Sequence, residues 1–575
     1  MLNSAQQAAI EAPLGPLRII AGPGTGKTRT LVQRIEGFIT QHRLLPAHIL
    51  ALTFTNKAAH ELTERLRANS HPGVASHTFH ALAARLLRQY WSPDFRILTE
   101  EEQRALLQQL LTATEYQQGV EILADWEQLA ERDFLQSEAR AFRSKLPEAR
   151  LRTLFREYQE ALQAAEALDF SQLQVRLLQL WRAQPAVLQQ CQQLFQAVLV
   201  DEYQDVSSFQ VELVCQLVKP HCNLTVVGDN DQTIYTWRGA RATSLQEFKT
   251  LFPAARTVRL THNYRNPPAV LRGAQALIAQ NADPLRTTLL AVKKIAPKIQ
   301  LWEVRSEAEE REVVLALLEQ QVGSISQMHT ADELDTAGTA NRALSELAIL
   351  YRTQAQGKQL EAALTQRGYP VQRSCGEHFW QRREVEAFLE TLAKYRDQAA
   401  LPTNQSLSTF LAEQIARLAL PRRKRKRLQQ LISWAVAFED LPCAQALPQF
   451  LDEARLQQET DNLGAAGALN LLTLHAAKGL EFPVVCLIGL TEGLLPAKRQ
   501  LADPASLAEE RRLLYVGLTR AKEELHLVTG RSAGEPSRFL AEITEDCFTR
   551  RQLTAKKLGQ VRRRAAKQAQ QSLDF

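Results

Sequence analysis

A glycine-rich segment near the N-terminus has the residue types and spacing of a phosphate-binding loop. Residues 21–28 read Ala-Gly-Pro-Gly-Thr-Gly-Lys-Thr, and they follow a short apolar run and precede a segment of helical composition. Gly24 and Gly26 allow the backbone to wrap around a phosphate, with N–H groups of the loop and of the helix N-terminus directed at it. In such a loop Lys27 reaches the β- and γ-phosphates, and Thr28 can bind Mg²⁺.

Two adjacent carboxylates, Asp201 and Glu202, follow a second apolar strand at residues 197–200. A carboxylate at the C-terminal end of a strand beside a phosphate-binding loop holds Mg²⁺, and an adjacent one can orient or deprotonate the attacking water. The carboxylate pair alone is a weak signal. Together with the loop it indicates that the chain binds and hydrolyses a nucleoside triphosphate.

The composition is that of an ordinary globular protein and excludes several other classes. The chain has 575 residues, of which 45% are hydrophobic and 23% charged, and at about 150 residues per domain it predicts roughly four domains. No apolar run reaches the ~18 residues of a membrane span and residues 1–13 carry no secretory signal, so we expect a cytoplasmic protein without a membrane partner. The cysteines are scattered without a Cys-x-x-Cys pair, which is typical of reduced thiols and indicates no zinc or iron–sulfur site.

Two kinds of sequence segment alternate along the chain and predict its fold class. Short apolar strands, each leading into a turn and a helix, form two sets, which is typical of an α/β fold with parallel sheets in two domains. The first set is expected at 17–21, 49–55, 74–77, 197–201, 224–228 and 257–260, and the second at 299–304, 347–351, 470–474, 483–488 and 525–528.

Long segments rich in Leu, Gln, Ala, Glu and Arg interrupt each set and are expected to be helical insertions. Residues 323–345 are polar and aperiodic, and they predict a surface loop. The expected divisions are 1–90 with 194–255 for the first domain, 91–193 for its insertion, 256–383 with 468–547 for the second domain, 384–467 for its reduced insertion, and 548–575 for a basic, disordered tail.

Further motifs resemble those of superfamily 1A helicases of the UvrD/Rep/PcrA type. They follow the family's order and, with shorter matches, extend from Leu2 to about Phe539. The resemblance implies two RecA-like P-loop domains, Mg²⁺ as the cofactor for ATP, and movement from 3′ to 5′ on single-stranded DNA and at single-strand/duplex junctions, in DNA repair or replication. The most specific motifs are Asp-Glu-Tyr-Gln-Asp at 201–205, Val-Gly-Asp-Asn-Asp-Gln-Thr-Ile-Tyr-Thr-Trp-Arg-Gly-Ala at 227–240, Asn-Tyr-Arg at 263–265, Leu-Thr-Leu-His-Ala-Ala-Lys-Gly-Leu-Glu-Phe at 472–482 and Glu-Glu-Arg-Arg-Leu-Leu-Tyr-Val-Gly-Leu-Thr-Arg-Ala at 509–521.

The resemblance also implies roles for individual residues. The catalytic residues would be Glu202, Gln232 and two arginines of the second domain, Arg265 and Arg520. Those that bind ATP would be Gln6, Ala21, Gly22, Pro23, Gly24, Thr25, Gly26, Lys27, Thr28, Arg29, Tyr264 and Glu481, with Thr28 and Asp201 holding Mg²⁺. Those that contact DNA would be Phe54, Asn56, His80, Tyr235, Trp237, Arg238, His475 and Lys478. Because the arginines cross a cleft, hydrolysis would require domain closure, and such an arginine contributes about 10³–10⁵ in rate.

The second insertion is shorter than the corresponding duplex-contacting subdomain of the large relatives. Two functions therefore stay open: a helicase that separates strands, and a single-strand translocase that displaces bound proteins with little unwinding. A non-catalytic DNA-binding scaffold is disfavoured by the intact ATP site. Within the insertion, the basic run Arg422–Arg427 is either a duplex contact or a solvated helix face.

The C-terminal residues 548–575 carry eight basic side chains and one acidic one. They end in Gln-Gln-Ser-Leu-Asp-Phe, which is similar to the Gln-x-x-Leu-x-Phe peptides that dock on the bacterial sliding clamp. In that interpretation Gln570 sets the register, and Leu573 and Phe575 enter an apolar pocket of the clamp. The alternative is a basic arm that contacts DNA without specificity.

Overall fold

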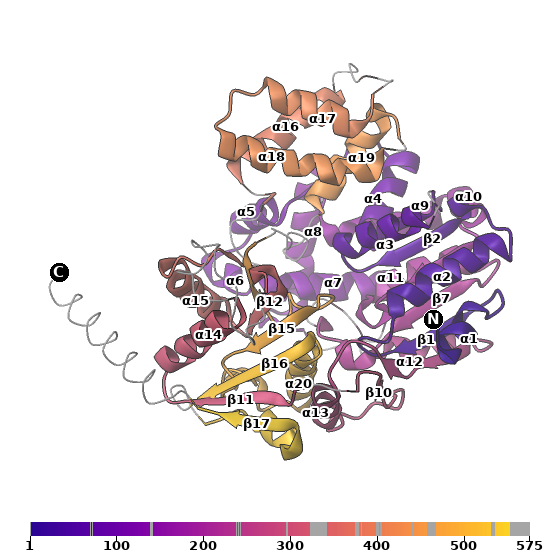
Figure 1. Ribbon diagram of the computed structural model, residues 1–575. Coiled ribbons are helices and arrows are strands. Elements are labelled where there is room, and N and C mark those ends of the chain that lie inside the picture. The colour runs from indigo at the N-terminus through magenta and orange to yellow at the C-terminus, as the bar shows by residue number, and fades with distance from the viewer. Residues whose placement is uncertain are drawn as a thin grey trace.

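The computed structural model is an α/β protein with parallel sheets in two domains, each accompanied by helices from a long insertion (Figure 1). It describes residues 2–69, 71, 73–137, 142–236, 239, 241, 243–294, 297–322, 342–373, 379–380, 382–397, 402, 405–439, 441–456, 467–530 and 535–552. Most of the loop expected at 323–345 lies outside these residues. Within them, no helix combines the length and the apolar character that crossing a bilayer requires.

The first sheet has six parallel strands in the order β3-β2-β6-β7-β1-β8. Its four central strands are buried along their whole length, as expected for a parallel sheet covered on both faces. The strands are β1 (Leu17–Ala21), β2 (Ile49–Thr53), β3 (Ala75–Thr78), β6 (Ala197–Val200), β7 (Leu224–Gly228) and β8 (Arg256–Leu260).

Helices cover both faces of this sheet and form a separate apolar core on each. One face is covered by α1 (Ser4–Ile10), α2 (Lys27–Thr40) and α3 (Asn56–Ala68). The other is covered by α4 (Phe79–Tyr90), α9 (Phe170–Ala183), α10 (Pro185–Leu194), α11 (Ser208–Val218) and α12 (Ser244–Leu251).

Strand β8 corrects the expected boundary between the domains after residue 255. It pairs with β1 in parallel, from Leu17 opposite Arg256 to Ala21 opposite Leu260, so the first sheet extends to Leu260. As an edge strand it leaves Arg256 and Arg259 exposed, so no fully apolar run marks where the chain leaves the sheet.

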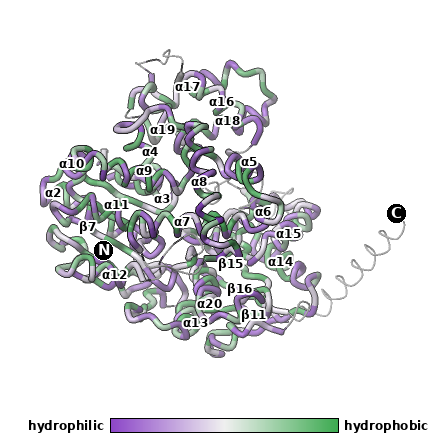
Figure 2. The backbone as a smooth tube through the Cα atoms, turned by 180° about the vertical axis from the view of Figure 1, so that it is seen from behind, coloured by the Kyte–Doolittle hydropathy of each residue, from purple (hydrophilic) through white to green (hydrophobic). Residues whose placement is uncertain are grey.

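The second sheet has seven parallel strands in the order β13-β14-β12-β15-β16-β11-β17. Helices α13 (Pro268–Ile278) and α20 (Pro504–Leu518) cover one face, and α14 (Glu307–Val322) and α15 (Gln354–Gln366) cover the other. The strands are β11 (Ile299–Val304), β12 (Leu347–Tyr351), β13 (Val371–Arg373), β14 (Leu469–Thr473), β15 (Phe482–Leu487), β16 (Ala521–Gly530) and β17 (Phe548–Arg551). Figure 2 shows that hydrophobic segments gather along the strands of both sheets.

Strand β17 corrects the expected start of the tail at residue 548. Phe548–Arg551 pairs in parallel with β11, and the Phe548 side chain is buried in the core of the second domain. Residues 553–575, which include the proposed clamp-docking peptide, lie outside the described residues.

The first insertion is smaller than the expected range 91–193. Its own core is formed by α5 (Glu100–Leu110), α7 (Gly119–Leu135) and α8 (Glu148–Ala164). The short helix α6 (Ala113–Tyr116) and the two-stranded sheet of β4 (Arg96–Ile97) and β5 (Ala167–Leu168) complete it. Helices α9 and α10 instead pack in the core of the first domain through residues such as Leu177 and Trp181, because their apolar faces meet α4 and α11.

The second insertion consists of α16 (Arg383–Asp397), α17 (Leu407–Arg417), α18 (Arg422–Ala435) and α19 (Cys443–Arg455) around a core of its own. Figure 1 shows these helices in orange above α3 and α4. Arg88 Nη2 of α4 donates to Asp452 Oδ1 at 2.6 Å, and Asn56 Nδ2 donates to the Leu456 carbonyl at 3.0 Å. Asn56, expected to contact DNA, is therefore buried against the second insertion.

Candidate nucleotide and nucleic-acid sites

The phosphate-binding loop connects the buried strand β1 to helix α2 at the C-terminal edge of the first sheet. Helix α2 begins at Lys27, directly after Gly26, whose φ of +85° is left-handed. Gly24 is left-handed as well, at +66°. Only glycine adopts such angles without strain, so the sequence folds locally as a loop with the helix N-terminus exposed to a ligand.

Two of the loop glycines are also in close contact with other segments of the chain. A Cβ on Gly24 would lie 2.5 Å from Arg265 Cβ, and one on Gly26 would lie 2.7 Å from Gln6 Nε2. Gln6 further donates from Nε2 to the Thr25 carbonyl at 3.1 Å. The structure therefore brings the expected adenine-reading residue and one expected catalytic arginine directly onto the loop.

The carboxylate pair lies beside Lys27, as the sequence predicts. Lys27 Nζ is 3.1 Å from Glu202 Oε1, and the Glu202 N–H donates to Asp201 Oδ1 at 2.9 Å. Burial and the charge of Glu202 raise the pKa of Asp201 to about 7. Burial opposes ionisation of Glu202 too, but the ammonium groups of Lys27 and Lys478 lower its pKa to about 2. Glu202 is thus the ionised member of the pair and can accept a proton or a hydrogen bond from water.

Glu202 has an unusual backbone conformation for its residue type. Its φ of +49° lies in the left-handed region, which non-glycine residues rarely adopt and which clusters at functional sites. The residue directly follows β6 and precedes a 3₁₀ turn at Tyr203–Asp205. This sharp turn directs two successive carboxylates to the same edge of the sheet.

The residues present fit a magnesium ion. Thr28 in the first turn of α2 and Asp201 after β6 supply a hydroxyl and a carboxylate, which are hard oxygen donors. Mg²⁺ binds few protein groups, keeps several waters and shares its remaining positions with substrate phosphates. The part of the chain that the structure describes holds no cluster of three His, Cys, Asp or Glu side chains that could bind a metal ion.

Gln204 is a site residue that sequence reasoning missed. Its buried side chain donates to Glu202, and its Oε1 accepts the Asp229 N–H at 3.0 Å. Asp229 Oδ2 in turn accepts a hydrogen bond of 2.7 Å from Gln232 Nε2. Gln204 lies within the motif at 201–205. Its amide side chain, close after a buried strand, is the sequence feature that could have identified it.

Arg520 reaches the first domain from the second. It follows α20, is only 1% exposed, and donates from Nη2 to Gln232 Oε1 at 3.3 Å. Its Nε donates to the Val516 carbonyl at 2.9 Å. Burial and the neighbouring charge of Arg265 lower the pKa of Arg520 to about 9. A guanidinium that gives up hydration in this way is ready to bind an anion at the cleft.

Arg265 lies in the connection that leads from the last strand of the first sheet, β8, to α13 of the second domain. It follows the short strand β9 (His262–Asn263) and forms an ion pair with Glu481, which also pairs with Lys522 at 2.8 Å. Arg265 Nε is buried and has no hydrogen-bond partner within the described chain. Its reach to Glu481 brings the expected ribose-binding carboxylate to the same cleft.

The remaining expected adenine residues lie at the mouth of the site. The Tyr264 side chain is 40% exposed, its hydroxyl accepts a hydrogen bond of 2.9 Å from Asn3 Nδ2, and its N–H donates to the Gly24 carbonyl at 2.8 Å. Arg29 is exposed on the first turn of α2. Asn3 caps helix α1 and so fixes Gln6, a capping box that the sequence analysis did not identify.

The expected DNA-contacting aromatics form a stacked pair. The rings of Phe54 and Tyr235 lie 4.9 Å apart at 21°, and the Tyr235 hydroxyl donates to the His475 carbonyl at 3.3 Å. Lys478 Nζ lies 5.1 Å from the centre of the Tyr235 ring. Trp237 and Arg238 lie outside the described residues.

Lys478 also contacts the nucleotide side. Its ammonium forms an ion pair with the buried Asp205 and donates to the Gln232 carbonyl. The side chain is 6% exposed. Lys478 therefore lies between the stacked rings of Phe54 and Tyr235 and the residues expected to bind nucleotide, and little of its side chain is exposed.

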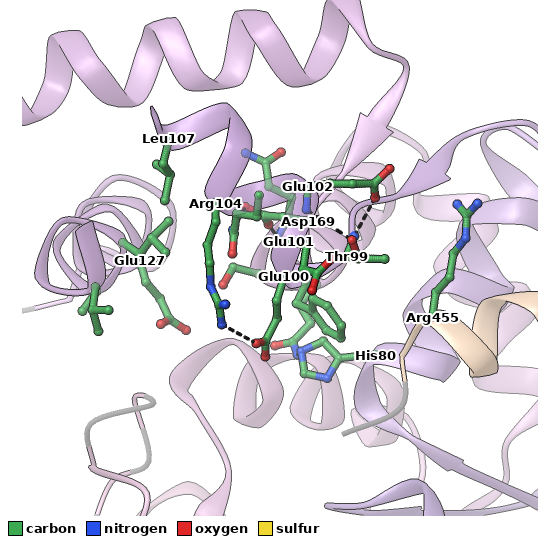
Figure 3. A pocket seen from close by; sticks show the side chains of 18 of the residues that line it. His80, Thr99, Glu100, Glu101, Glu102, Arg104, Leu107, Glu127, Asp169 and Arg455 are labelled. Atoms are coloured by element: carbon green, nitrogen blue, oxygen red, sulfur yellow. Dashed lines mark hydrogen bonds and ion pairs between the residues drawn. The ribbon is translucent and has the colours of Figure 1, made fainter. Parts of the chain in front are cut away.

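A cavity of about 1110 Å³ is lined by residues of both domains and of both insertions. Phe54, His80, Tyr235 and His475 line it on the side of the sheets. Figure 3 shows part of the lining, where Arg104 turns toward Glu100 beside His80, and Glu127 lies on the far side of Arg104 from His80. Glu101 and Glu102 line the cavity as well. Burial and the charges of Glu131 and Asp169 raise the pKa of Glu127 to about 7. Carboxylates on this wall disfavour a phosphate backbone beside it.

The fold and the site together define an ATP-binding protein with two parallel-sheet domains that meet over one phosphate-binding loop. The chain matches the UvrD/REP helicase N-terminal domain over residues 2–253 and the UvrD-like helicase C-terminal domain over residues 258–412 and 402–532. It belongs to the UvrD/Rep helicase family and is an ATP-dependent DNA helicase.

Several curated relatives are similar over nearly the whole chain. ATP-dependent DNA helicase PcrA of Leuconostoc citreum is 31% identical, with 95% of this chain and 85% of the relative covered. PcrA of Bacillus subtilis is 31% identical, with 95% and 86% covered. DNA helicase II of Escherichia coli is 31% identical, with 96% and 89% covered.

Proposed function

We propose that the cleft between the domains hydrolyses ATP with Lys27 on the β- and γ-phosphates and Glu202 on the attacking water. The observation that carries this proposal is the position of Glu202 at the end of β6, with its Oε1 3.1 Å from Lys27 Nζ of the phosphate-binding loop. Arg265 and Arg520 neutralise charge on the transferring phosphoryl group. Support comes from the buried, unpaired Nε of Arg265 and from the bond between Arg520 and Gln232.

We further propose that Gln6 reads the adenine edge while Arg29 and Tyr264 enclose the ring and Glu481 contacts the ribose. Thr28 and Asp201 would hold Mg²⁺, which supplies positive charge to the phosphates when bound. In that arrangement Lys27 positions the phosphates, Glu202 accepts a proton from water, and Gln232 senses the γ-phosphate.

Single-stranded DNA is the proposed substrate of the cavity, with bases stacking on the aromatic residues. Phe54, Tyr235 and Trp237 would form the platform, and His80, Arg238 and His475 would contact the backbone. Because the described rings of Phe54 and Tyr235 stack on each other, a base between them requires the two rings to separate. Asn56 and Lys478 are buried in protein contacts, so we propose that they transmit movement between the parts of the molecule instead of touching DNA.

We propose movement from 3′ to 5′, in DNA repair or replication within the cytoplasm. The experiment measures strand separation on duplexes with a 3′ or a 5′ single-stranded tail, together with DNA-stimulated ATP hydrolysis. Preferential unwinding of the 3′-tailed duplex is expected. Equal unwinding of both, or unwinding of the 5′-tailed duplex alone, would overturn the proposed direction.

A translocase that displaces bound proteins with little unwinding is the second candidate. The alignment with PcrA of Leuconostoc citreum extends over 656 positions, more than the 575 residues of this chain, so the relative has segments that this chain lacks. Exposed basic residues at the start of α18 supply a candidate duplex contact. ATP-driven protein displacement without strand separation would favour this candidate.

A further inference from the structure

Two buried asparagines connect the phosphate-binding loop to the carbonyls of Thr519 and Ala521, the residues before and after Arg520. Asn263 and Asn266 follow one another closely in the connection between the domains, and both side chains are 0% exposed. Asn263 Nδ2 donates to the Pro23 carbonyl of the loop at 2.7 Å and to Asn266 Oδ1 at 2.9 Å. Asn266 Nδ2 donates to the Thr519 carbonyl at 3.0 Å and to the Ala521 carbonyl at 2.7 Å.

Each polar group of the pair is satisfied. Asn263 Oδ1 accepts the N–H of Asn266 at 2.8 Å and that of Arg265 at 3.1 Å, so both of its oxygen lone pairs and both of its amide hydrogens are used. A buried, fully satisfied network of amides is rigid, because each lost bond leaves an uncompensated group in a low-dielectric interior. The pair therefore fixes the loop and the second domain to each other at one place.

The bonds from Asn266 reach the two carbonyls that flank Arg520, which lies between Thr519 and Ala521. Holding the carbonyls of the residues before and after Arg520 restrains the backbone from which its side chain extends, in addition to the bonds that Arg520 itself donates to the Val516 and Leu480 carbonyls. The same side chain then meets Gln232 of the first domain at 3.3 Å. A catalytic group displaced by about 1 Å can lose on the order of 10²-fold in rate, so control of this direction matters for hydrolysis.

We propose that Asn266 is a positioning residue that orients Arg520 toward the transferring phosphoryl group. Asn263 holds Asn266 in place relative to the phosphate-binding loop. The proposal rests on the catalytic role proposed above for Arg520. Under this proposal, the connection between the domains both carries Arg265 and positions Arg520.

The test measures ATP hydrolysis at saturating single-stranded DNA and the affinity for a fluorescent ATP analogue in Asn266→Ala, Arg520→Ala and the double variant. Asn266→Ala should lower kcat by about 10- to 100-fold and leave nucleotide affinity unchanged. Because Asn266 acts through Arg520, the double variant should be no slower than Arg520→Ala alone.

Asn470 provides a matched control in the second domain. It is 4% exposed, and its Nδ2 donates to the Ser345 and Leu347 carbonyls at 3.0 Å each, at the end of β14 away from the cleft. Asn470→Ala likewise removes two hydrogen bonds from one side-chain amide to two backbone carbonyls. It should lower the thermal midpoint while kcat stays near that of the wild type. If Asn266→Ala does not fold, Asn266→Ser, which keeps one hydroxyl donor, takes its place in both backgrounds.

Equal kcat values for Asn266→Ala and Asn470→Ala would overturn the inference. So would a double variant whose loss in kcat equals the product of the losses in Asn266→Ala and Arg520→Ala, since the two residues would then act independently. These outcomes differ from failure of the proposed function. In that case Arg520→Ala itself would hydrolyse ATP at the wild-type rate.

Discussion

Gln232 of the first domain accepts a hydrogen bond of 3.3 Å from Arg520 of the second, and both side chains are at most 2% exposed. The bond joins a glutamine that directly follows the carboxylate segment after β7 to an arginine that follows α20. In this arrangement neither side chain is open to water, so each group depends on protein partners for its hydrogen bonds. The bond therefore joins one side chain of each domain at the place where hydrolysis is proposed.

Replacement of Lys27 and Glu202 should separate nucleotide binding from hydrolysis. Lys27→Ala should lose ATP binding, because the loop then lacks its cation. Glu202→Gln should bind ATP and lower kcat by about 10²–10⁴-fold, since an amide cannot accept a proton from water. Nucleotide titration and phosphate release measure the two effects, with Lys219→Ala on the exposed end of α11 as control. Near-normal turnover by Glu202→Gln would refute its role as the base.

Removal of the Lys478 ammonium should destabilise the protein through its buried partner. Lys478→Met leaves the Asp205 carboxylate, which is 0% exposed, without its cation. Breaking one side of a buried ion pair costs about 3–5 kcal/mol. Chemical unfolding measures the loss, and the double variant Lys478→Met/Asp205→Asn should recover most of it. As control, Arg65→Met breaks an exposed pair with Glu61 and should cost about 0–1 kcal/mol. Equal losses for the two single variants would contradict the prediction.

Glu310 predicts a pH-dependent stability in the second domain. Its carboxylate accepts the Gly489 N–H at 2.9 Å, and burial raises its pKa to about 6 from an ordinary value of 4.5. The folded protein thus holds the proton more tightly than the unfolded chain. The associated stability is complete below pH 4.5 and is lost as the pH rises through 6.

Glu310→Gln cannot ionise and should escape this loss. The thermal midpoint of the wild type, relative to that of the variant, should fall between pH 5 and pH 7. Glu309→Gln, one residue earlier on α14, controls for removal of a charge. A difference between wild type and Glu310→Gln that stays constant over this range would show that Glu310 does not titrate there.

The C-terminal peptide should bind a bacterial sliding clamp if the interpretation of its last residues is correct. A peptide of residues 568–575 presents Leu573 and Phe575 as apolar anchors and Gln570 as a polar one. Titration of purified clamp should detect binding of this peptide and none of a Leu573→Ala/Phe575→Ala version. Docking would raise the local concentration of the motor at replicating DNA without a new contact in the motor itself. No binding by the native peptide would leave a nonspecific basic arm.

The sequence predicted best those elements whose residues are buried on both sides. Strands β1, β7 and β12 begin and end at the predicted residues, because a central parallel strand is a mainly apolar run. Strand β11 also has the predicted bounds, although it alternates between buried and partly exposed residues. The edge strand β17 was assigned to the tail, and β8 was predicted as a strand of the first set but fell beyond the domain boundary drawn at residue 255. Both strands face water along part of their length and carry arginines.

Some features of the candidate site could be predicted from the sequence and others could not. Motif spacing placed Lys27 and Glu202 together, because a loop after one strand and a carboxylate after another meet at the same sheet edge. The contacts of Asn266 with Thr519 could not be predicted, since they join residues 253 positions apart through the packing of the whole second domain. No local pattern encodes such a pairing.

Lys478 touches the Tyr235 ring on one side and the Asp205 carboxylate on the other, so one ammonium connects the two proposed ligand sites. If this connection couples ATP binding to DNA binding, the coupling is thermodynamically reciprocal. Whatever factor ATP imposes on the affinity for single-stranded DNA, the DNA must impose on the affinity for ATP, commonly about 5- to 150-fold. A measurement of either factor therefore gives the other, and the protein cannot change its affinity for DNA on binding ATP without an equal change in its affinity for ATP on binding DNA.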